Sequence, residues 1–361
     1  MKNNKLETKI AYAVAVFFIF SFAGLPPLAA QPVPGWVNDL EKAFPSKDWV
    51  AVTANGSSQP QAENAAMNAL ARAFKTDVAG LTQTSQRFSQ IVYDAAGKKT
   101  VSFDESKSFS QDVNTSTNVK GLIGVQIDVF RAKDNTVYVN ARMNRRECSA
   151  RYSGMIRENA ATINRLLADA AAIPEQDSFD VYSRLSFAYA IALVTDNFQN
   201  ILEVLDPTAV NRKPGYGGAN AIKTKMLECS SRITIGIVMD TEQQADKTQL
   251  TRAAGSFFRD LGFRINEQGA SGKPEAGNYV LRVNARFEGL SQNVVSCRYY
   301  LDAVLENRNK TAVFSFTEDD RKAHPNSAAE ARRLAVRAAE TSFKEGKFAQ
   351  EFNSWLNSFL D

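Results

Sequence analysis

Histidine is nearly absent from this chain of 361 residues, in which His324 is the only one. A single imidazole excludes sites that need two histidines in one chain, such as HExxH zinc sites and histidine-rich di-iron centres. Any serine or cysteine nucleophile would have to use His324 as its base, and the surrounding Lys-Ala-His-Pro-Asn sequence is typical of a solvated turn. A GxxxxGK sequence is missing too, which excludes a P-loop. The sequence therefore predicts no catalytic, cofactor-binding or metal-binding residue, and we expect no enzyme.

The chain also lacks an apolar run long enough to span a membrane. Its longest, residues 10–25, follows three lysines and is broken by Pro26. Sixteen residues fall short of the roughly 20 that cross a bilayer, so the pattern predicts an export signal over residues 1–30, cleaved near Ala30. No cysteine lies near the cut, which argues against lipid attachment there. We expect a periplasmic or outer-membrane-associated protein without a transmembrane span after cleavage.

Cysteine is scarce, with Cys148, Cys229 and Cys297. Disulfides form in pairs, so at least one of three thiols in an exported chain stays unpaired. Cys148, expected at the end of a strand, and Cys229 both fall near the expected junction of two domains. They are the first pair to test for a disulfide, and the alternative is three small buried thiols.

A large charge of either sign is missing as well. The chain has 43 Lys plus Arg against 39 Asp plus Glu, and removal of the signal leaves 40 against 38, a formal charge of +2. So balanced a chain has no global electrostatic reason to bind nucleic acid, and we expect no such partner. The 44% of hydrophobic residues suffice for globular cores, and the length predicts two domains.

Residues 31–174 show the pattern of an α+β domain. Strands are indicated by alternating apolar residues and helices by apolar residues three or four apart. Residues 82–94 suit either element, and the polar stretch 104–118 predicts an exposed loop. The expected elements are a short helix over 36–44, a strand over 48–53, a helix over 62–81, a hairpin of strands 119–129 and 137–143 with its turn at 133–135, and a helix from Ser149 to just before Pro174.

Residues 175–231 are expected to bridge the domains through two helices within 178–205 and a glycine-rich linker at 213–220. Residues 232–361 again show an α+β pattern. The expected elements there are a strand over 233–237, a helix capped by Asp246 and stopped by Gly262, strands over 279–287, 297–305 and 312–316 with a turn at 307–310, and a long final helix that starts at the capping box Ser327–Glu330 and bends near Gly346. The predicted fold class is α+β, with two domains, each a mainly antiparallel sheet packed by helices, joined by a helical segment.

The order of features over about 34–172 resembles the bacterial twenty-kilodalton envelope lipoprotein family, whose domain is similar to the N-terminal domain of flagellar assembly protein T. The residues that carry this are Pro34-Gly-Trp36, the strand and glycine within 50–56, the alanine-rich helix 62–81, and Val119-Lys-Gly121 leading to the strand 137–143. The missing lipid-attachment cysteine departs from that pattern. Residues 232–361 are weakly similar to TolB N-terminal and penicillin-binding-protein activator domains. Both resemblances imply envelope accessory proteins without catalysis.

Four further motifs have plain structural interpretations. Gly215-Tyr-Gly-Gly lacks the preceding strand and the third glycine of a dinucleotide fingerprint. Glu318-Asp-Asp is expected in a turn, where Arg321 and Lys322 would oppose a divalent cation. The basic residues of the last helix alternate with glutamates, as on an ordinary charged helix face. The aromatic stripe of that helix, expected to pack in the core and alternatively to dock a partner, comprises Phe348, Phe352, Trp355 and Phe359.

Two functional hypotheses are consistent with the sequence. The leading hypothesis is an exported, non-enzymatic cell-envelope accessory or assembly protein that acts through protein–protein contacts. Its partners would be other envelope proteins, with cell-wall or flagellar components as further candidates, and its oligomeric state is left open. The alternative is a periplasmic carbohydrate- or peptidoglycan-binding module or hydrolase with dispersed carboxylates. A cleft with two carboxyl groups would favour the alternative.

Overall fold

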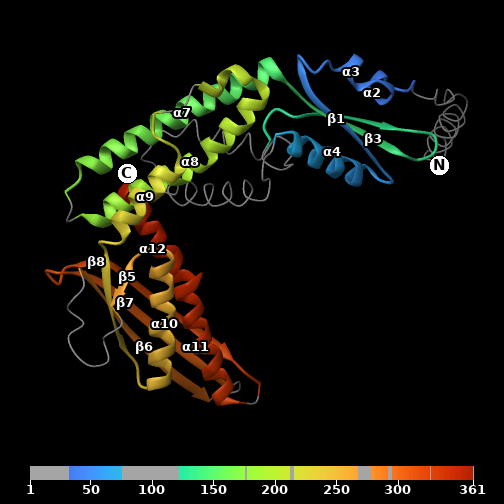
Figure 1. The fold of residues 1–361 in the computed structure, drawn as a ribbon. Helices are drawn as coiled ribbons and strands as arrows, with labels where there is room; N and C mark the ends of the chain where they lie inside the picture. The colour runs from blue at the N-terminus through green and yellow to red at the C-terminus, as the bar shows by residue number, and fades with distance from the viewer. Residues whose placement is uncertain are drawn as a thin grey trace, which may run out of the picture.

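The computed structural model describes residues 32–74, 122–174, 177–211, 215–266, 278–291, 295–325 and 327–360, with the side chains of 210, 211, 290 and 291 left out. Within these residues, helices pack around a three-stranded and a five-stranded sheet (Figure 1). The α+β class is therefore confirmed. The expected signal segment and the stretches 82–94 and 104–118 lie outside the described residues.

The N-terminal sheet has the strand order β1-β3-β2 and is antiparallel throughout. Val50 lies opposite Met143, and Ile127 lies opposite Ala141, so apolar residues line one face. Helix α4 packs on that face through fully buried residues such as Leu70. The expected hairpin turn is present, with the Ala132 N–H donating to the Thr136 carbonyl at 2.9 Å. The elements are β1 (Trp49–Gly56), α4 (Gln59–Ala73), β2 (Gln126–Arg131) and β3 (Val137–Asn144).

The prediction of a single short helix over 36–44 is wrong. Asp39 is extended and divides α2 (Gly35–Asn38) from α3 (Leu40–Ala43). Its carboxylate accepts from the Lys42 N–H at 3.0 Å, which starts the second helix as an N-cap.

Two helices of 28 residues follow, α7 (Arg145–Ala172) and α8 (Ser178–Leu205), and they pack side by side. Helix α7 begins four residues before the expected Ser149, because the Asn144 side chain caps it by accepting from the Glu147 N–H at 2.9 Å. Cys148 thus lies in a helix and not at a strand end. Likewise, one continuous α8 replaces the two helices expected within 178–205. At about 1.5 Å per residue, α8 is about 42 Å long.

Helix α8 contributes to three hydrophobic cores. Phe179 and Tyr182, near its start, are buried with the C-terminal sheet, and its last residues, including Phe198 and Leu205, are buried with the N-terminal sheet. Its middle packs on α7 and on α9 (Ala219–Ser230). In Figure 1, α8 lies beside α7 and α9, between the two sheet regions. The domain boundaries expected at 174 and 232 stay predictions.

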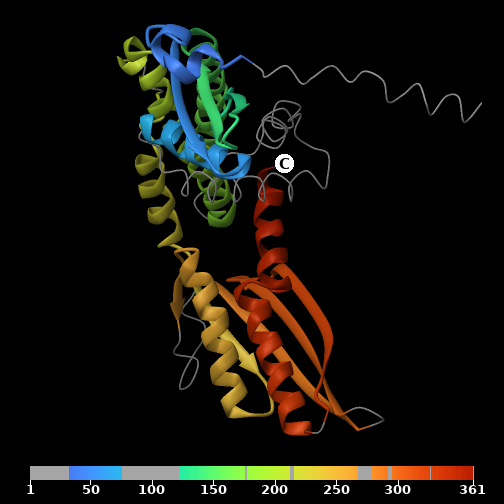
Figure 2. The same ribbon diagram turned by 90° about the vertical axis from the view of Figure 1, so that its right-hand side faces the viewer.

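The C-terminal sheet has the order β5-β4-β6-β7-β8. The last three strands are antiparallel as expected, whereas β4 is parallel to both β5 and β6, so the sheet is mixed. Helices α10 and α11 cover one face (Figure 2). The short strand β5 was not expected. The elements are β4 (Thr234–Asp240), α10 (Gln244–Asp260), β5 (Arg264–Asn266), β6 (Tyr279–Ser291), β7 (Val295–Asn307), β8 (Ala312–Ala323), α11 (Ala328–Lys344) and α12 (Lys347–Asn357).

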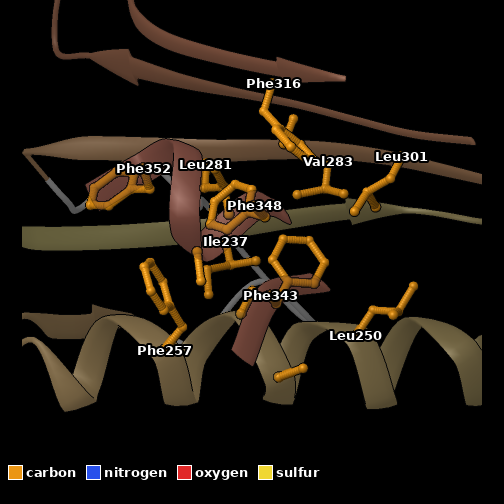
Figure 3. Packing of buried hydrophobic residues seen from close by; sticks show 14 of the residues in the cluster. Ile237, Leu250, Phe257, Leu281, Val283, Leu301, Phe316, Phe343, Phe348 and Phe352 are labelled. Atoms are coloured by element: carbon orange, nitrogen blue, oxygen red, sulfur yellow. The ribbon is translucent and has the colours of Figure 1, made fainter. Parts of the chain in front are cut away.

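The aromatic stripe of the last helix packs into the core, as expected. Phe348 and Phe352 are fully buried, and Figure 3 shows them between the strands and α10. The helix breaks near Gly346, where a Cβ would lie 2.7 Å from the Ser342 Cα. A glycine therefore permits the sharp turn from α11 into α12, which directs both phenylalanines onto the sheet.

Two placements in this region were wrong. Asp246 does not cap α10, which begins at Gln244; it is buried in the first turn and pairs with Arg332 at 2.6 Å. Asp319 and Asp320 lie within β8 and not in a turn, because that strand extends to Ala323.

The disulfide hypothesis is also wrong, because all three cysteines are free. Cys148 is buried in the core of the N-terminal sheet, where its thiol lies 3.7 Å from the Gly124 carbonyl. Cys229 packs against the C-terminal core, where its thiol lies 3.5 Å from the Ser178 carbonyl. The alternative of separate thiols holds.

Replacing Phe179 should loosen α8 from the C-terminal core. Its ring lies 4.5 Å from that of Tyr279 and 5.1 Å from that of Trp355. We expect Phe179→Ala to lower the free energy of unfolding by about 3–5 kcal/mol, since it leaves a cavity among aromatic rings. Urea denaturation followed by circular dichroism measures this. The control, Leu227→Ala on the exposed side of α9, should change stability by less than about 0.5 kcal/mol, and equal effects would contradict the account.

Alkaline pH should destabilise the protein. Burial raises the pKa of Tyr152 and of Tyr182 above the ordinary 10. Folding then favours the protonated phenols, so their contribution to stability is complete below pH 10 and is lost as the pH rises from there towards the raised values. We expect the Tm to fall steadily above about pH 10, with a smaller pH slope in Tyr182→Phe. Parallel slopes for the two proteins would count against this reading.

Candidate functional site: the cleft beside Arg145

A cleft of about 750 Å³ opens where the loop before β1, the start of α7 and the end of α8 meet. Three segments that are far apart in the sequence form its walls. Its lining residues are Ser46, Lys47, Asp48, Trp49, Asn144, Arg145, Arg146, Ser149, Val204, Leu205, Asp206 and Pro207.

Arg145 holds the walls of this cleft together. Its Nε donates to the Ser46 carbonyl at 2.8 Å, and Nη1 donates to the carbonyls of Val204 and Leu205, the latter at 3.2 Å. Its backbone N–H donates to the Asp48 carbonyl at 2.9 Å. The last carbonyls of a helix lack intrahelical donors and carry partial negative charge. Arg145 therefore caps the end of α8 and joins it to the loop before β1.

Two other cations of the cleft contribute little to the stability of the fold. Arg146 is exposed, and its guanidinium has no acceptor among the residues that the structure describes. The Lys47 Nζ lies 3.9 Å from the Asp48 carboxylate, and both side chains are exposed, so this pair contributes little to stability. Lys47 and Arg146 are free to meet a ligand.

Two carboxylates also lie in the cleft, Asp48 and Asp206. One oxygen of Asp206 accepts from the Thr208 N–H at 3.0 Å and from its hydroxyl at 2.6 Å. That carboxylate therefore has a local structural use at the turn that follows α8. Asp48 has only the distant Lys47 among the described cations within ion-pair distance.

The glycine-rich run starts a helix and shows no feature of a nucleotide site. Gly217 and Gly218 adopt positive φ. The Asp196 carboxylate on α8 accepts from the Tyr216 hydroxyl and from the Ala219 N–H, each at 2.9 Å. Residues 213 and 214 of the expected linker lie outside the described residues. The run thus joins the start of α9 to α8.

The acidic run of β8 is engaged with nearby side chains. Glu318 accepts from the Tyr299 hydroxyl at 2.9 Å and from the Ser342 hydroxyl. The Arg298 guanidinium holds the pKa of Asp319 below its ordinary value, and Lys322 does the same for Asp320. Within the described ranges, no group of three or more His, Cys, Asp or Glu side chains could hold a metal ion.

His324 lies directly after β8, where its backbone N–H donates to the Val295 carbonyl at 2.9 Å. On α11, Arg333 pairs with Glu330 and Lys344 with Glu340, as on a charged helix face. Arg332 differs, since it reaches the buried Asp246. In the described part of the chain, no helix has the length and hydrophobicity required to span a bilayer.

The sequence pattern identified no residue of the Arg145 cleft as a site residue. A signal was present, because two arginines follow a predicted strand and an asparagine that can cap a helix. What the pattern could not supply is the partner of that segment, since the end of α8 lies 60 residues further along the chain.

No family model matches the chain, and no curated protein does. The resemblance to the twenty-kilodalton envelope lipoprotein family therefore stays a prediction. Among solved structures, the chain is similar to a secreted protein from Helicobacter pylori, with 11% identity, a TM-score of 0.35 and coverage of 82% of this chain and 97% of that chain.

Two shorter likenesses involve other bacterial proteins. One is a minor lipoprotein from Acinetobacter baumannii, with 14% identity, a TM-score of 0.23 and coverage of 35% of this chain and 94% of that chain. The other is the PelC dodecamer from Paraburkholderia phytofirmans, with 14% identity, a TM-score of 0.25 and coverage of 33% and 89%. At these TM-scores the likenesses carry no argument about function.

Arg145 and Arg146 are adjacent residues whose replacement should affect stability very differently. We expect Arg145→Ala to lower the free energy of unfolding by about 2–4 kcal/mol, because it leaves the Ser46, Val204 and Leu205 carbonyls without their charged donor. Arg146→Ala should change it by less than about 0.5 kcal/mol. Urea denaturation of the two variants beside the wild type tests this, and a reversed order would disprove the role of Arg145.

Proposed function

We propose that this protein is an exported, non-enzymatic cell-envelope accessory or assembly protein that acts through protein–protein contacts. The export segment expected over residues 1–30 supports the location. The observation that carries the proposal is the continuity of α8, whose two ends are buried in the cores of two different sheets. A single rigid helix between two folded regions keeps their surfaces at a set separation, which suits a protein that positions partners.

The hydrogen bonds at the start of α8 support the same interpretation. The Ser183 hydroxyl donates to the Leu356 carbonyl at 2.6 Å, and the Tyr182 hydroxyl donates to the Leu261 carbonyl at 2.9 Å. Arg145 plays the matching part at the other end. Such bonds restrict movement between the regions more than apolar packing alone, because hydrogen bonds are directional.

One observation favours the alternative, a carbohydrate- or peptidoglycan-binding module or hydrolase. Asp48 and Asp206 line one cleft, and paired carboxylates are the usual catalytic groups of glycoside hydrolysis. The bonds from Thr208 to Asp206 weaken this alternative, since they occupy one of the two carboxylates. We therefore place it second.

The proposal is tested by capture from crosslinked envelopes. We expect the full chain, with an affinity tag at its C-terminus, to fractionate with the envelope and to retain one or a few envelope proteins reproducibly. An unrelated exported protein with the same tag is the control. Retention of an uncleaved chain in the cytoplasm would refute export, and recovery of the same proteins by the control would refute specific contact.

The alternative has its own test. Purified protein is incubated with peptidoglycan, and released fragments are measured for the wild type, Asp48→Asn and Asp206→Asn. We expect no release by any of the three. Release by the wild type that either substitution abolishes would replace our proposal with the hydrolase.

A further inference from the structure

We propose that the Arg145 cleft binds a short peptide segment of a protein partner in which acidic side chains alternate with apolar ones, with Lys47 and Arg146 contacting the carboxylates. This inference rests on the proposed function, because it assigns to one site the contact with a partner. It follows from the charge, lining and rigidity of the cleft.

The charge of the lining favours an anion. Lys47, Arg145 and Arg146 contribute three positive charges, against two negative charges from Asp48 and Asp206. The Arg145 guanidinium donates to the carbonyl oxygens of Ser46, Val204 and Leu205. Asp206 directs one oxygen at Thr208. The two cations without a close partner are therefore the groups best placed to bind.

The size and the apolar part of the lining favour a peptide over a free oxyanion. A cleft of about 750 Å³ lies in the roughly 300–1,000 Å³ range of ligand sites and has room for several residues of a peptide. Trp49, Val204 and Pro207 line the cleft and are half-buried or exposed, so they contribute an apolar part that a phosphate ion would leave in water. A segment with an apolar residue beside an acidic one satisfies both parts of the lining.

The walls are preformed, which lowers the cost of binding. Arg145 ties the loop before β1 to the end of α8, and the Asn144 cap orders the first turn of α7. Ser149 is held by its own hydrogen bond to the Arg146 carbonyl at 3.1 Å. A peptide would therefore bind without reordering the backbone of these segments.

The probe is a fluorescein-labelled six-residue peptide of alternating Leu and Asp, titrated with the full chain and followed by fluorescence polarisation. We expect saturable binding that weakens several-fold between about 50 and 500 mM salt, since exposed charge pairs are screened. The same peptide with Asn in place of Asp should bind at least fivefold more weakly. Equal binding of the two peptides would overturn the charge assignment.

The variant Lys47→Ala/Arg146→Ala should weaken binding of the acidic peptide about fivefold or more, as expected for two contacts worth roughly 0.5–1 kcal/mol each. The matched control is Arg157→Ala/Lys225→Ala, which removes two exposed cations of α7 and α9 that do not line the cleft. We expect the control to bind like the wild type and both variants to keep the wild-type Tm. Equal loss in both double variants would overturn the site, and displacement of the peptide by inorganic phosphate at a similar concentration would overturn the peptide assignment.

The failure of this inference can be told apart from that of the proposed function. If envelope proteins are captured equally by the wild type and by Lys47→Ala/Arg146→Ala, the contacts stand and the cleft is not their site. If the wild type captures nothing specific, the proposed function itself is wrong.

Discussion

The structure depends on the burial of both ends of α8 in two separate cores. Phe179 lies among aromatic rings of the C-terminal sheet region, and Phe198 packs on Tyr152 beside the N-terminal sheet. Freeing either end would expose large apolar side chains, at about 25 cal/mol for each Å² returned to water. The position of one sheet relative to the other is therefore coupled to the stability of both cores.

Side-chain donors at backbone carbonyls complete this arrangement. Ser183 and Tyr182 bind carbonyls of the C-terminal region, and Arg145 binds the last carbonyls of α8 from the N-terminal region. Each bond is made to an oxygen at or near a helix end, where backbone donors of the same helix become scarce. The three polar contacts therefore fix position, while the apolar packing around them contributes most of the stabilisation.

Short-range patterns were enough to predict much of this fold. Alternating residues located the strands on both sides of the 307–310 turn, and the spacing of Phe348 and Phe352 located a buried helix face. The errors concern properties that distant residues decide. Asp246 was expected to cap a helix because the sequence does not show that its carboxylate pairs with Arg332, 86 residues away. The end of β8 looked like a turn because it is a run of charged residues. It is a strand because such charges are paired across the sheet, as between Arg298 and Asp319. The continuity of α8 was missed because its two halves bury their faces in different cores.

The Arg145 cleft could not be predicted for the same reason, since its walls come from residues 46–49, 144–149 and 204–207. Its position nevertheless follows from the constraint on α8. A helix that ends at the surface of a core leaves its last carbonyls for a neighbouring donor, and the donor here is Arg145, the first residue of α7. That meeting of three chain segments leaves a concave surface that Lys47 and Arg146 help to line. A partner bound there would touch the end of the same helix whose start is held by the other sheet, so one contact would orient both regions of the protein.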